Sequence, residues 1–330
     1  MAKYKVVHIA LQEDPLTIER EQLKGIDCEV VSVACRSQGE IIEAVKEADV
    51  VLNTNLPMYR PVIQQMTRCK QIIRYGHGYD TVDVEAATEK GIIVTNIAGV
   101  CSEEVSNHAL MFLLACSRKL VLLDRRLRQG EWGRPKLTGG IGTIYDQTLG
   151  LVAFGNIARA LARKAKALGM RVIAYDPYVY PWIAREYGVT LVSFEQLLKE
   201  SDFISIHCPL YDETRHLFNE KTLRAMKKTA YIINTARGPV IDEKALIKAL
   251  QQGWIAGAAL DVFEQEPTPP DNPLLKMENV IVTPHSAGAS DAVNHEVRVR
   301  VGQEAARVLR GQRPQVVVNP EVMSKVKLGV

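Results

Sequence analysis

The sequence has no block of like charge and no apolar run long enough to cross a membrane. Its 41 basic and 38 acidic residues are scattered along the chain and leave a net charge of +3, which predicts no surface for nucleic acid or an anionic membrane. The longest apolar stretches, such as HALMFLLAC, are much shorter than the about 20 residues that a spanning helix needs. The opening residues, MAKYKVVHIALQED, lack a signal-peptide pattern.

Cysteine is scarce and forms no recognisable motif. The six cysteines contain no C-x-x-C pair and no metal-ligand spacing. Several lie within apolar runs, where a buried reduced thiol is expected. We therefore predict reduced thiols, no metal site and a cytoplasmic location.

The segment LGLVAFGNIARALARKAKALGMRVIAYDP (149–177) lacks two of the three glycines of the G-x-G-x-x-G dinucleotide fingerprint, which falls on Ala153, Gly155 and Ala158. Gly155 keeps the central position, where the backbone approaches a pyrophosphate at a helix N-terminus. Ala158 is an accepted substitute, whereas Ala153 is tolerated only if its φ is negative. Asp176, 21 residues after Gly155, stands where a ribose-binding carboxylate is expected. A carboxylate there would repel a 2′-phosphate, which favours NAD over NADP, although strand, turn and helix could also be scaffold alone.

Short β-branched runs alternate with helical periodicity along all 330 residues, which predicts an α/β protein with parallel sheets. Two long helical patterns, one over about 102–128 and one following residue 290, bracket the second series of strands. We therefore predict two doubly wound parallel-sheet domains. A Rossmann NAD-binding domain (101–289) is inserted into a flavodoxin-like substrate domain (1–100 and 290–330). Asn219 and Asp242 are expected to cap helices.

Three candidate catalytic residues follow predicted strands. Arg237 follows AYIINTA, His285 follows NVIVTP, and Glu266 lies just past GAALDV, so all three belong to the edge where open α/β sheets bind ligands. Together they offer a cation for an anionic group and a proton donor, beside a predicted cofactor site that could supply a hydride. Each residue has a simpler interpretation: Arg237 could pair with Asp242 or Glu243, His285 could be a packed histidine, and Glu266 a solvated acid.

Several segments together resemble the NAD-dependent D-isomer-specific 2-hydroxyacid dehydrogenases. They are IIRYGHGYDTVDVEAA, GIIVTNIAGVCSEEVSNHAL, GEW, the stretch from residue 201 to 267 that contains NTARG and EQEP, and NVIVTPHSAGAS. The resemblance covers nearly the whole chain, with the motifs in the family's order. Some segments also resemble the C-terminal-binding-protein-like branch.

The resemblance implies a role for each candidate residue. Arg237 would anchor and polarise the substrate, His285 would protonate the alkoxide, and Glu266 would orient the imidazole and favour its charged form. Residues implied to contact NAD are Gly155, Asn156, Ile157, Asp176, Ser102, Pro209, Thr235, Ala236 and Asp261. Residues implied to contact the substrate are Arg74, Tyr59, and Gly76, His77 and Gly78, the last three through backbone N–H groups.

The sequence thus predicts an NAD-dependent dehydrogenase of small 2-oxo and D-2-hydroxy acids, acting in a cleft between two domains. The loop NTNLPMYRP, with Asn55, Met58 and Tyr59, is expected to shape the side-chain pocket. The resemblance also implies a homodimer through the helix that starts near Ser102. The alternatives are an NAD(H)-responsive, corepressor-like binding protein with little turnover, or a pseudoenzyme that has lost its cofactor.

Overall fold

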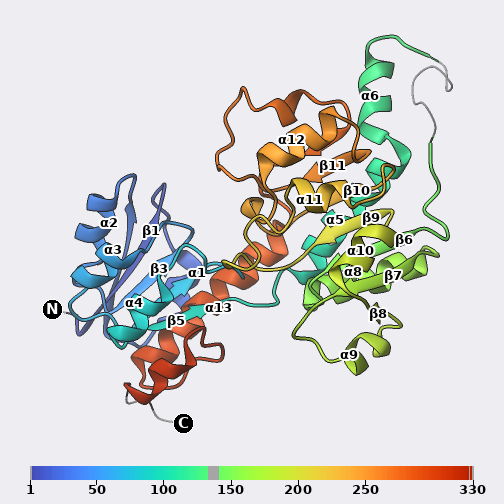
Figure 1. Cartoon of the computed structure of the whole chain (residues 1–330). Coiled ribbons are helices and arrows are strands. Elements are labelled where there is room, and N and C mark those ends of the chain that lie inside the picture. Colours follow the sequence, from blue (N-terminus) through green and yellow to red (C-terminus); the bar gives the residue numbers. More distant parts are fainter. Residues whose placement is uncertain (1, 133–140, 327, 329–330) are drawn as a thin grey trace. The chain divides into compact units, whose positions relative to one another are not determined.

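A computed structural model describes residues 2–132, 141–326 and 328. The chain forms two compact units, Met1–Cys101 with Ser290–Val330, and Ser102–Ala289. In Figure 1 the first unit runs from blue to teal and returns in red, and the second runs from green to orange. Within the described residues, the helices are too short or too polar to span a bilayer.

The first unit is built on a parallel sheet of five strands in the order β2-β1-β3-β4-β5. This is the flavodoxin-like order, in which the strand sequence reverses between β1 and β3. The strands are β1 (Tyr4–Ala10), β2 (Cys28–Ala34), β3 (Val50–Asn53), β4 (Gln71–Arg74) and β5 (Ile93–Asn96).

Helices cover both faces of this sheet because alternate strand residues point to opposite sides. Val7 and Ile9 pack with α2 (Gln38–Val45), α3 (Arg60–Gln65) and α4 (Val84–Glu89). Val6 packs on the other face with Leu16 and Leu23, which flank α1 (Thr17–Gln22), and with the long α13 (Asp291–Leu309). The chain end returns to the sheet edge, where the Val318 N–H donates to the Val94 carbonyl oxygen, 2.8 Å away, before the 3-10 turn η3 (Pro320–Ser324).

The second unit has a parallel sheet of seven strands in the order β12-β11-β10-β9-β6-β7-β8. Six of them follow the Rossmann order, which reverses between β6 and β9 and places ligands at the carboxyl ends of the strands. The strands are β6 (Thr148–Val152), β7 (Arg171–Tyr175), β8 (Thr190–Leu191), β9 (Phe203–Ile206), β10 (Tyr231–Asn234), β11 (Gly257–Leu260) and β12 (Val280–Val282). The two all-parallel sheets confirm the predicted fold class.

Two apolar layers sandwich the seven-stranded sheet. One contains α5 (Ser102–Arg118) and α8 (Asn156–Ala167), and the other contains α10 (Phe194–Glu200), α11 (Glu220–Arg224) and α12 (Glu243–Gln251). The remaining helical elements are α6 (Leu120–Arg128), α9 (Pro181–Glu186), η1 (Gly238–Val240) and η2 (Pro273–Lys276).

Local signals in the sequence predicted two helix starts and missed one break. The side chains of Asn219 and Asp242 accept backbone N–H groups at the starts of α11 and α12, so both caps are confirmed. The single helical pattern expected from Ser102 to Arg128 is wrong, because Lys119 adopts a left-handed conformation (φ 52°) that separates α5 from α6. Neither glycine nor proline marks this break.

Candidate active site

The turn between β6 and α8 presents backbone N–H groups. Gly155 precedes the first turn of α8 in an extended conformation (φ −80°), and no side chain caps this helix. A Cβ atom placed on Gly155 would meet nothing within 4 Å. Because the first N–H groups of a helix carry partial positive charge, this turn can hold an anion such as a pyrophosphate. Gly155 and Asn156 are exposed, and Ile157 is half-buried.

Ala153 requires a correction. From the sequence, alanine at position 153 was expected to be tolerated only with a negative φ, but Ala153 has a φ of 69°. The left-handed conformation costs an alanine about 1–2 kcal/mol because Cβ crowds the following carbonyl oxygen. Two hydrogen bonds hold the strained residue: the Ala153 N–H donates to the Tyr175 carbonyl oxygen, and the Phe154 N–H donates to Asp176 Oδ2, both over 2.8 Å.

Asp176 therefore also holds the turn. Besides accepting from Phe154 through Oδ2, its Oδ1 accepts the N–H groups of Tyr178 (2.8 Å) and Val179 (3.1 Å). These contacts fix the carboxylate at the end of β7, beside the start of α8.

We expect Ala153→Gly to stabilise the protein by about 0.5–1 kcal/mol. Relief of the left-handed strain exceeds the greater entropy of glycine in the unfolded chain. The melting temperature should rise by about 2 °C. Ala158→Gly is the control, since Ala158 is fully buried in α8 and its replacement should lower the melting temperature. A decrease in both variants would show that Ala153 is not strained.

The loop after β10 positions Arg237. The Asn234 side chain is fully buried; its Nδ2 donates to the Arg237 carbonyl oxygen (2.9 Å), and its Oδ1 accepts the Ala236 N–H (3.0 Å). Thr235 is 9% exposed, and its Oγ1 has no hydrogen-bond partner among the described residues. Buried hydroxyls in native proteins are seldom left unpaired, and this oxygen is able to form a hydrogen bond with a polar ligand group.

Gly238 lets this loop approach the loop that follows β11. A Cβ atom on Gly238 would lie 1.8 Å from the Phe263 carbonyl oxygen. Any residue other than glycine would therefore overlap this oxygen. The close approach brings Arg237 near enough for its charge to act on Glu266.

The two acids considered as partners of Arg237 both make hydrogen bonds at the start of α12 or to the nearby loops. Asp242 caps α12. Glu243 accepts the Glu264 N–H (3.2 Å) and Asn272 Nδ2 (2.8 Å). These contacts tie both acids to α12 and to the loop that follows β11.

Asp261 organises the turn that carries His285. The carboxylate is 1% exposed. Its Oδ1 accepts the Ser286 N–H and its Oδ2 the Ala287 N–H, each over 2.8 Å, and the His285 N–H donates to the Asp261 carbonyl oxygen (2.7 Å). These bonds hold His285 at φ 52°, a left-handed conformation that costs free energy and that the surrounding contacts must maintain.

His108 of α5 is a polar neighbour that sequence reasoning missed. Its Nε2 lies 2.9 Å from Thr283 Oγ1, and Thr283 Oγ1 in turn donates to Asp261 Oδ1 (2.5 Å). Burial lowers the pKa of His108 despite the nearby Asp261 charge. Asn234 was missed as well; only its position at the end of a buried strand, directly before the TARG segment, could have marked it.

His285 and Glu266 form a close pair. His285 Nδ1 lies 2.6 Å from Glu266 Oε2, and Glu266 Oε1 accepts the Phe263 N–H (3.0 Å). The His285 side chain is 46% exposed, so it is not a packed interior histidine. Burial alone would raise the pKa of Glu266, but the two hydrogen bonds and the charges of His285 and Arg237 together lower it.

The lowered pKa of Glu266 predicts a pH-dependent contribution to stability. A carboxylate whose pKa falls on folding stabilises the protein above its ordinary pKa, here 4.5, and this contribution is lost as pH falls through the folded-state value. We expect Glu266→Gln to melt at a lower temperature than the wild type at neutral pH. The difference should shrink as the pH falls from 4.5 through the lower folded-state pKa. A difference that stays constant from neutral to acid pH would contradict this.

Two other histidines of this unit have different surroundings. Burial lowers the pKa of His207 to about 3, and its Nε2 lies 2.9 Å from Ser205 Oγ. His216 pairs with Glu264 (2.5 Å). Neither of these contacts involves His285 or Glu266.

The residues expected to bind substrate lie in the other unit, on the loops after β3 and β4. Arg74 is 5% exposed and donates to the carbonyl oxygens of these loops, whereas Tyr59 is 52% exposed at the start of α3. Met58 was expected to shape a pocket, but it is fully buried among core residues and pairs with Val82 in a β-bridge. Its place in the core rules it out as a pocket residue.

Two further residues expected at the cofactor lie at element ends of the second unit. Ser102 is the first residue of α5. Pro209 follows β9, and its carbonyl oxygen accepts a hydrogen bond from Thr214 Oγ1 (2.7 Å). No group of three or more potential metal ligands occurs within the described ranges.

Comparison with known proteins matches the second unit to a family model. Residues 110–287 match the "D-isomer specific 2-hydroxyacid dehydrogenase, NAD binding domain". The chain is 45% identical over 295 residues to a glyoxylate reductase of Korarchaeum cryptofilum, covering 87% of each chain. It is 40% identical over 321 residues to a D-3-phosphoglycerate dehydrogenase of Methanocaldococcus jannaschii, covering 97% of this chain and 61% of the relative.

One solved structure is similar to this chain over nearly all the residues of both units. The D-lactate dehydrogenase of Aquifex aeolicus, complexed with NAD and lactic acid, superposes with a TM-score of 0.85 at 28% identity, covering 95% of this chain and 99% of that one. These relatives are named as reductases or dehydrogenases, which does not favour the corepressor-like alternative.

Proposed function

Because the chain belongs to the D-isomer-specific 2-hydroxyacid dehydrogenase family, we propose that it reduces glyoxylate and similarly small 2-oxo acids. It is an NAD-dependent oxidoreductase that transfers hydride between NAD(H) and 2-oxo or 2-hydroxy acids. The observation that carries the proposal is the 2.6 Å contact between His285 Nδ1 and Glu266 Oε2. The close approach of Gly238 to Phe263 brings the loop that carries Arg237 next to the loop that carries Glu266.

The second unit fits NAD. The uncapped start of α8 suits the pyrophosphate, and the unpaired Thr235 hydroxyl suits a polar group of the cofactor. Asp176 favours NAD over NADP, since its carboxylate is already held by backbone N–H groups and repels a 2′-phosphate. We assign cofactor binding to residues 101–289, through Gly155, Asn156, Ile157, Asp176, Ser102, Pro209, Thr235, Ala236 and Asp261.

Three side chains perform the chemistry. When bound, NADH supplies the hydride. The Arg237 guanidinium binds the substrate carboxylate and polarises the carbonyl group. His285 donates a proton to the carbonyl oxygen as negative charge develops there, and Glu266 holds the imidazole through Nδ1, so that Nε2 carries the transferred proton.

We assign substrate binding to residues 1–100 and 290–330, with Tyr59 and the backbone N–H groups of Gly76, His77 and Gly78. For Arg74 we propose a positioning role in place of direct contact. Six free thiols favour a reducing compartment, the cytoplasm. Exposed apolar side chains on α5 and α6 favour a homodimer through these helices: Met111, Leu120, Val121 and Leu127.

A panel of 2-oxo acids with NADH tests the proposal. We expect glyoxylate to be reduced, measured as loss of NADH absorbance, and NADPH to serve at least about tenfold less well because of Asp176. Omission of the acid is the control. Tight NADH binding without turnover of any acid would contradict the proposed function and favour a binding protein.

A further inference from the structure

The loop after β4, residues 75–79, is held by its carbonyl oxygens. The Ile97 N–H donates to the Gly76 carbonyl (2.9 Å), Asn96 Nδ2 to the His77 carbonyl (2.5 Å), and Arg74 Nε to the Gly78 carbonyl (3.1 Å). Asn96 ends β5 and Arg74 ends β4, so both side chains belong to the carboxyl edge of the sheet.

Holding a carbonyl also orients the next N–H group. In a planar trans peptide the C=O bond and the following N–H bond point in opposite directions. The N–H group of His77 is therefore directed away from the Ile97 backbone, and those of Gly78 and Tyr79 away from the Asn96 and Arg74 side chains. Gly76, with φ 122°, provides the turn that this path requires.

Arg74 joins this loop to the one after β3. Its Nη1 donates to the Asn53 (2.9 Å) and Thr54 carbonyls, and its Nη2 donates to Asn55 Oδ1 (2.8 Å). One planar guanidinium thereby fixes the backbones of both loops, which a lysine could not do with a single ammonium group.

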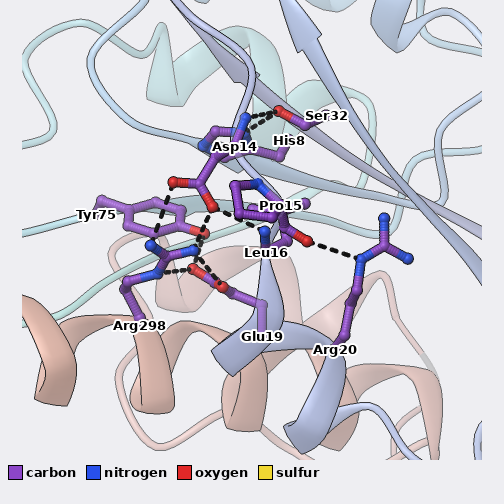
Figure 2. Close-up of polar contacts among 9 residues, drawn as sticks. All are labelled: His8, Asp14, Pro15, Leu16, Glu19, Arg20, Ser32, Tyr75 and Arg298. Atoms are coloured by element: carbon purple, nitrogen blue, oxygen red, sulfur yellow. Dashed lines mark hydrogen bonds and ion pairs between the residues drawn. The ribbon is translucent and has the colours of Figure 1, made fainter.

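Tyr75 ties the start of the loop to the helical layer. Its hydroxyl donates to Glu19 Oε1 (2.8 Å), and Glu19, fully buried in α1, is also bound by Arg298 of α13 at 2.8 and 2.9 Å. Figure 2 shows the Tyr75 hydroxyl and the Arg298 guanidinium meeting at the Glu19 carboxylate, with Asp14 on the far side of Arg298.

The buried side chain of Asn96 has an amide oxygen that accepts no hydrogen bond from the described residues. The residue is 5% exposed, and the oxygen is Oδ1. An unpaired buried acceptor is costly, and a residue selected only for stability would not retain it. The amide is kept for its Nδ2 donor, which holds the His77 carbonyl.

We propose that Arg74 and Asn96 are positioning residues that turn the N–H groups of loop 75–79 toward the substrate carboxylate. The inference rests on the proposed function, because it concerns how that substrate is bound. Neither side chain contacts the substrate itself; each acts through the backbone that it holds.

Two Asn96 variants test the proposal with glyoxylate and NADH. Asn96→Ala and Asn96→Asp both remove the donor to the His77 carbonyl. We expect each to raise KM for glyoxylate about tenfold while kcat and the dissociation constant of NADH stay within about twofold of the wild type. Thr95→Val is the matched control: Thr95 is fully buried in the same strand and accepts Gln71 Nε2 (3.1 Å), so its loss should lower the melting temperature and leave KM unchanged.

Arg74→Lys provides a second variant, and it should raise KM in the same way because it keeps the charge but releases the loops. If the Asn96 and Arg74 variants fold and keep the wild-type KM, the inference about positioning is overturned and the proposed function still stands. A wild-type enzyme that binds NADH but reduces no 2-oxo acid would instead overturn the proposed function. A KM increase in Thr95→Val as large as in Asn96→Ala would show a general stability effect and also overturn the inference.

Discussion

Replacement of His285 by glutamine should lower the turnover of 2-oxo acids about 100- to 10 000-fold, the usual contribution of a general acid. Glutamine keeps a hydrogen-bonding group near Glu266 but has no proton to transfer at neutral pH. The dissociation constant of NADH should change little, because the cofactor residues proposed for the second unit include the α8 turn and Asp176 but not His285. Single-turnover kinetics and fluorescence titration with NADH measure the two quantities separately.

His216→Gln is the matched control for this prediction. Like His285, His216 has positive φ (53°) and pairs with a glutamate, Glu264, at 2.5 Å. If a strained histidine–glutamate pair acted only through stability, both variants would lose activity equally. Wild-type turnover in His285→Gln, or an equal loss in His216→Gln, would contradict the assignment of His285 as the acid.

The sequence was sufficient for features that depend on strand ends and local caps. Arg237, Glu266 and His285 each follow an apolar strand, and parallel strands bring their carboxyl ends to one edge of a sheet. Asn219 and Asp242 were predictable because a helix cap depends on a side chain and a backbone N–H group two or three residues away.

Features set by distant contacts were not predictable. The positive φ of Ala153 is maintained by bonds to Tyr175 and Asp176, more than twenty residues away. The resemblance implied that Arg74 contacts the substrate, whereas its guanidinium donates to two loops of its own unit. Lys119 interrupts a continuous helical pattern with no residue that signals a break. In each case tertiary contacts override the local preference.

Gly238→Ala should be the most damaging single-methyl change in the site. The added Cβ would lie 1.8 Å from the Phe263 carbonyl oxygen and 2.5 Å from the Glu264 nitrogen. Both are backbone atoms, so no side-chain rotation can relieve the overlap, and the two loops must separate. We expect the second unit to lose about 3 kcal/mol of stability, roughly 10 °C in melting temperature.

Activity should fall further than stability alone would predict, because separation of the loops moves Arg237 away from Glu266. A displacement of about 1 Å can lower kcat/KM about 100-fold, measurable at a temperature where the variant is still folded. Gly39→Ala is the control, since a Cβ atom on the exposed Gly39 of α2 meets nothing within 4 Å and alanine favours helix. A Gly238→Ala variant that melts and turns over like Gly39→Ala would show that the two loops are not held in contact.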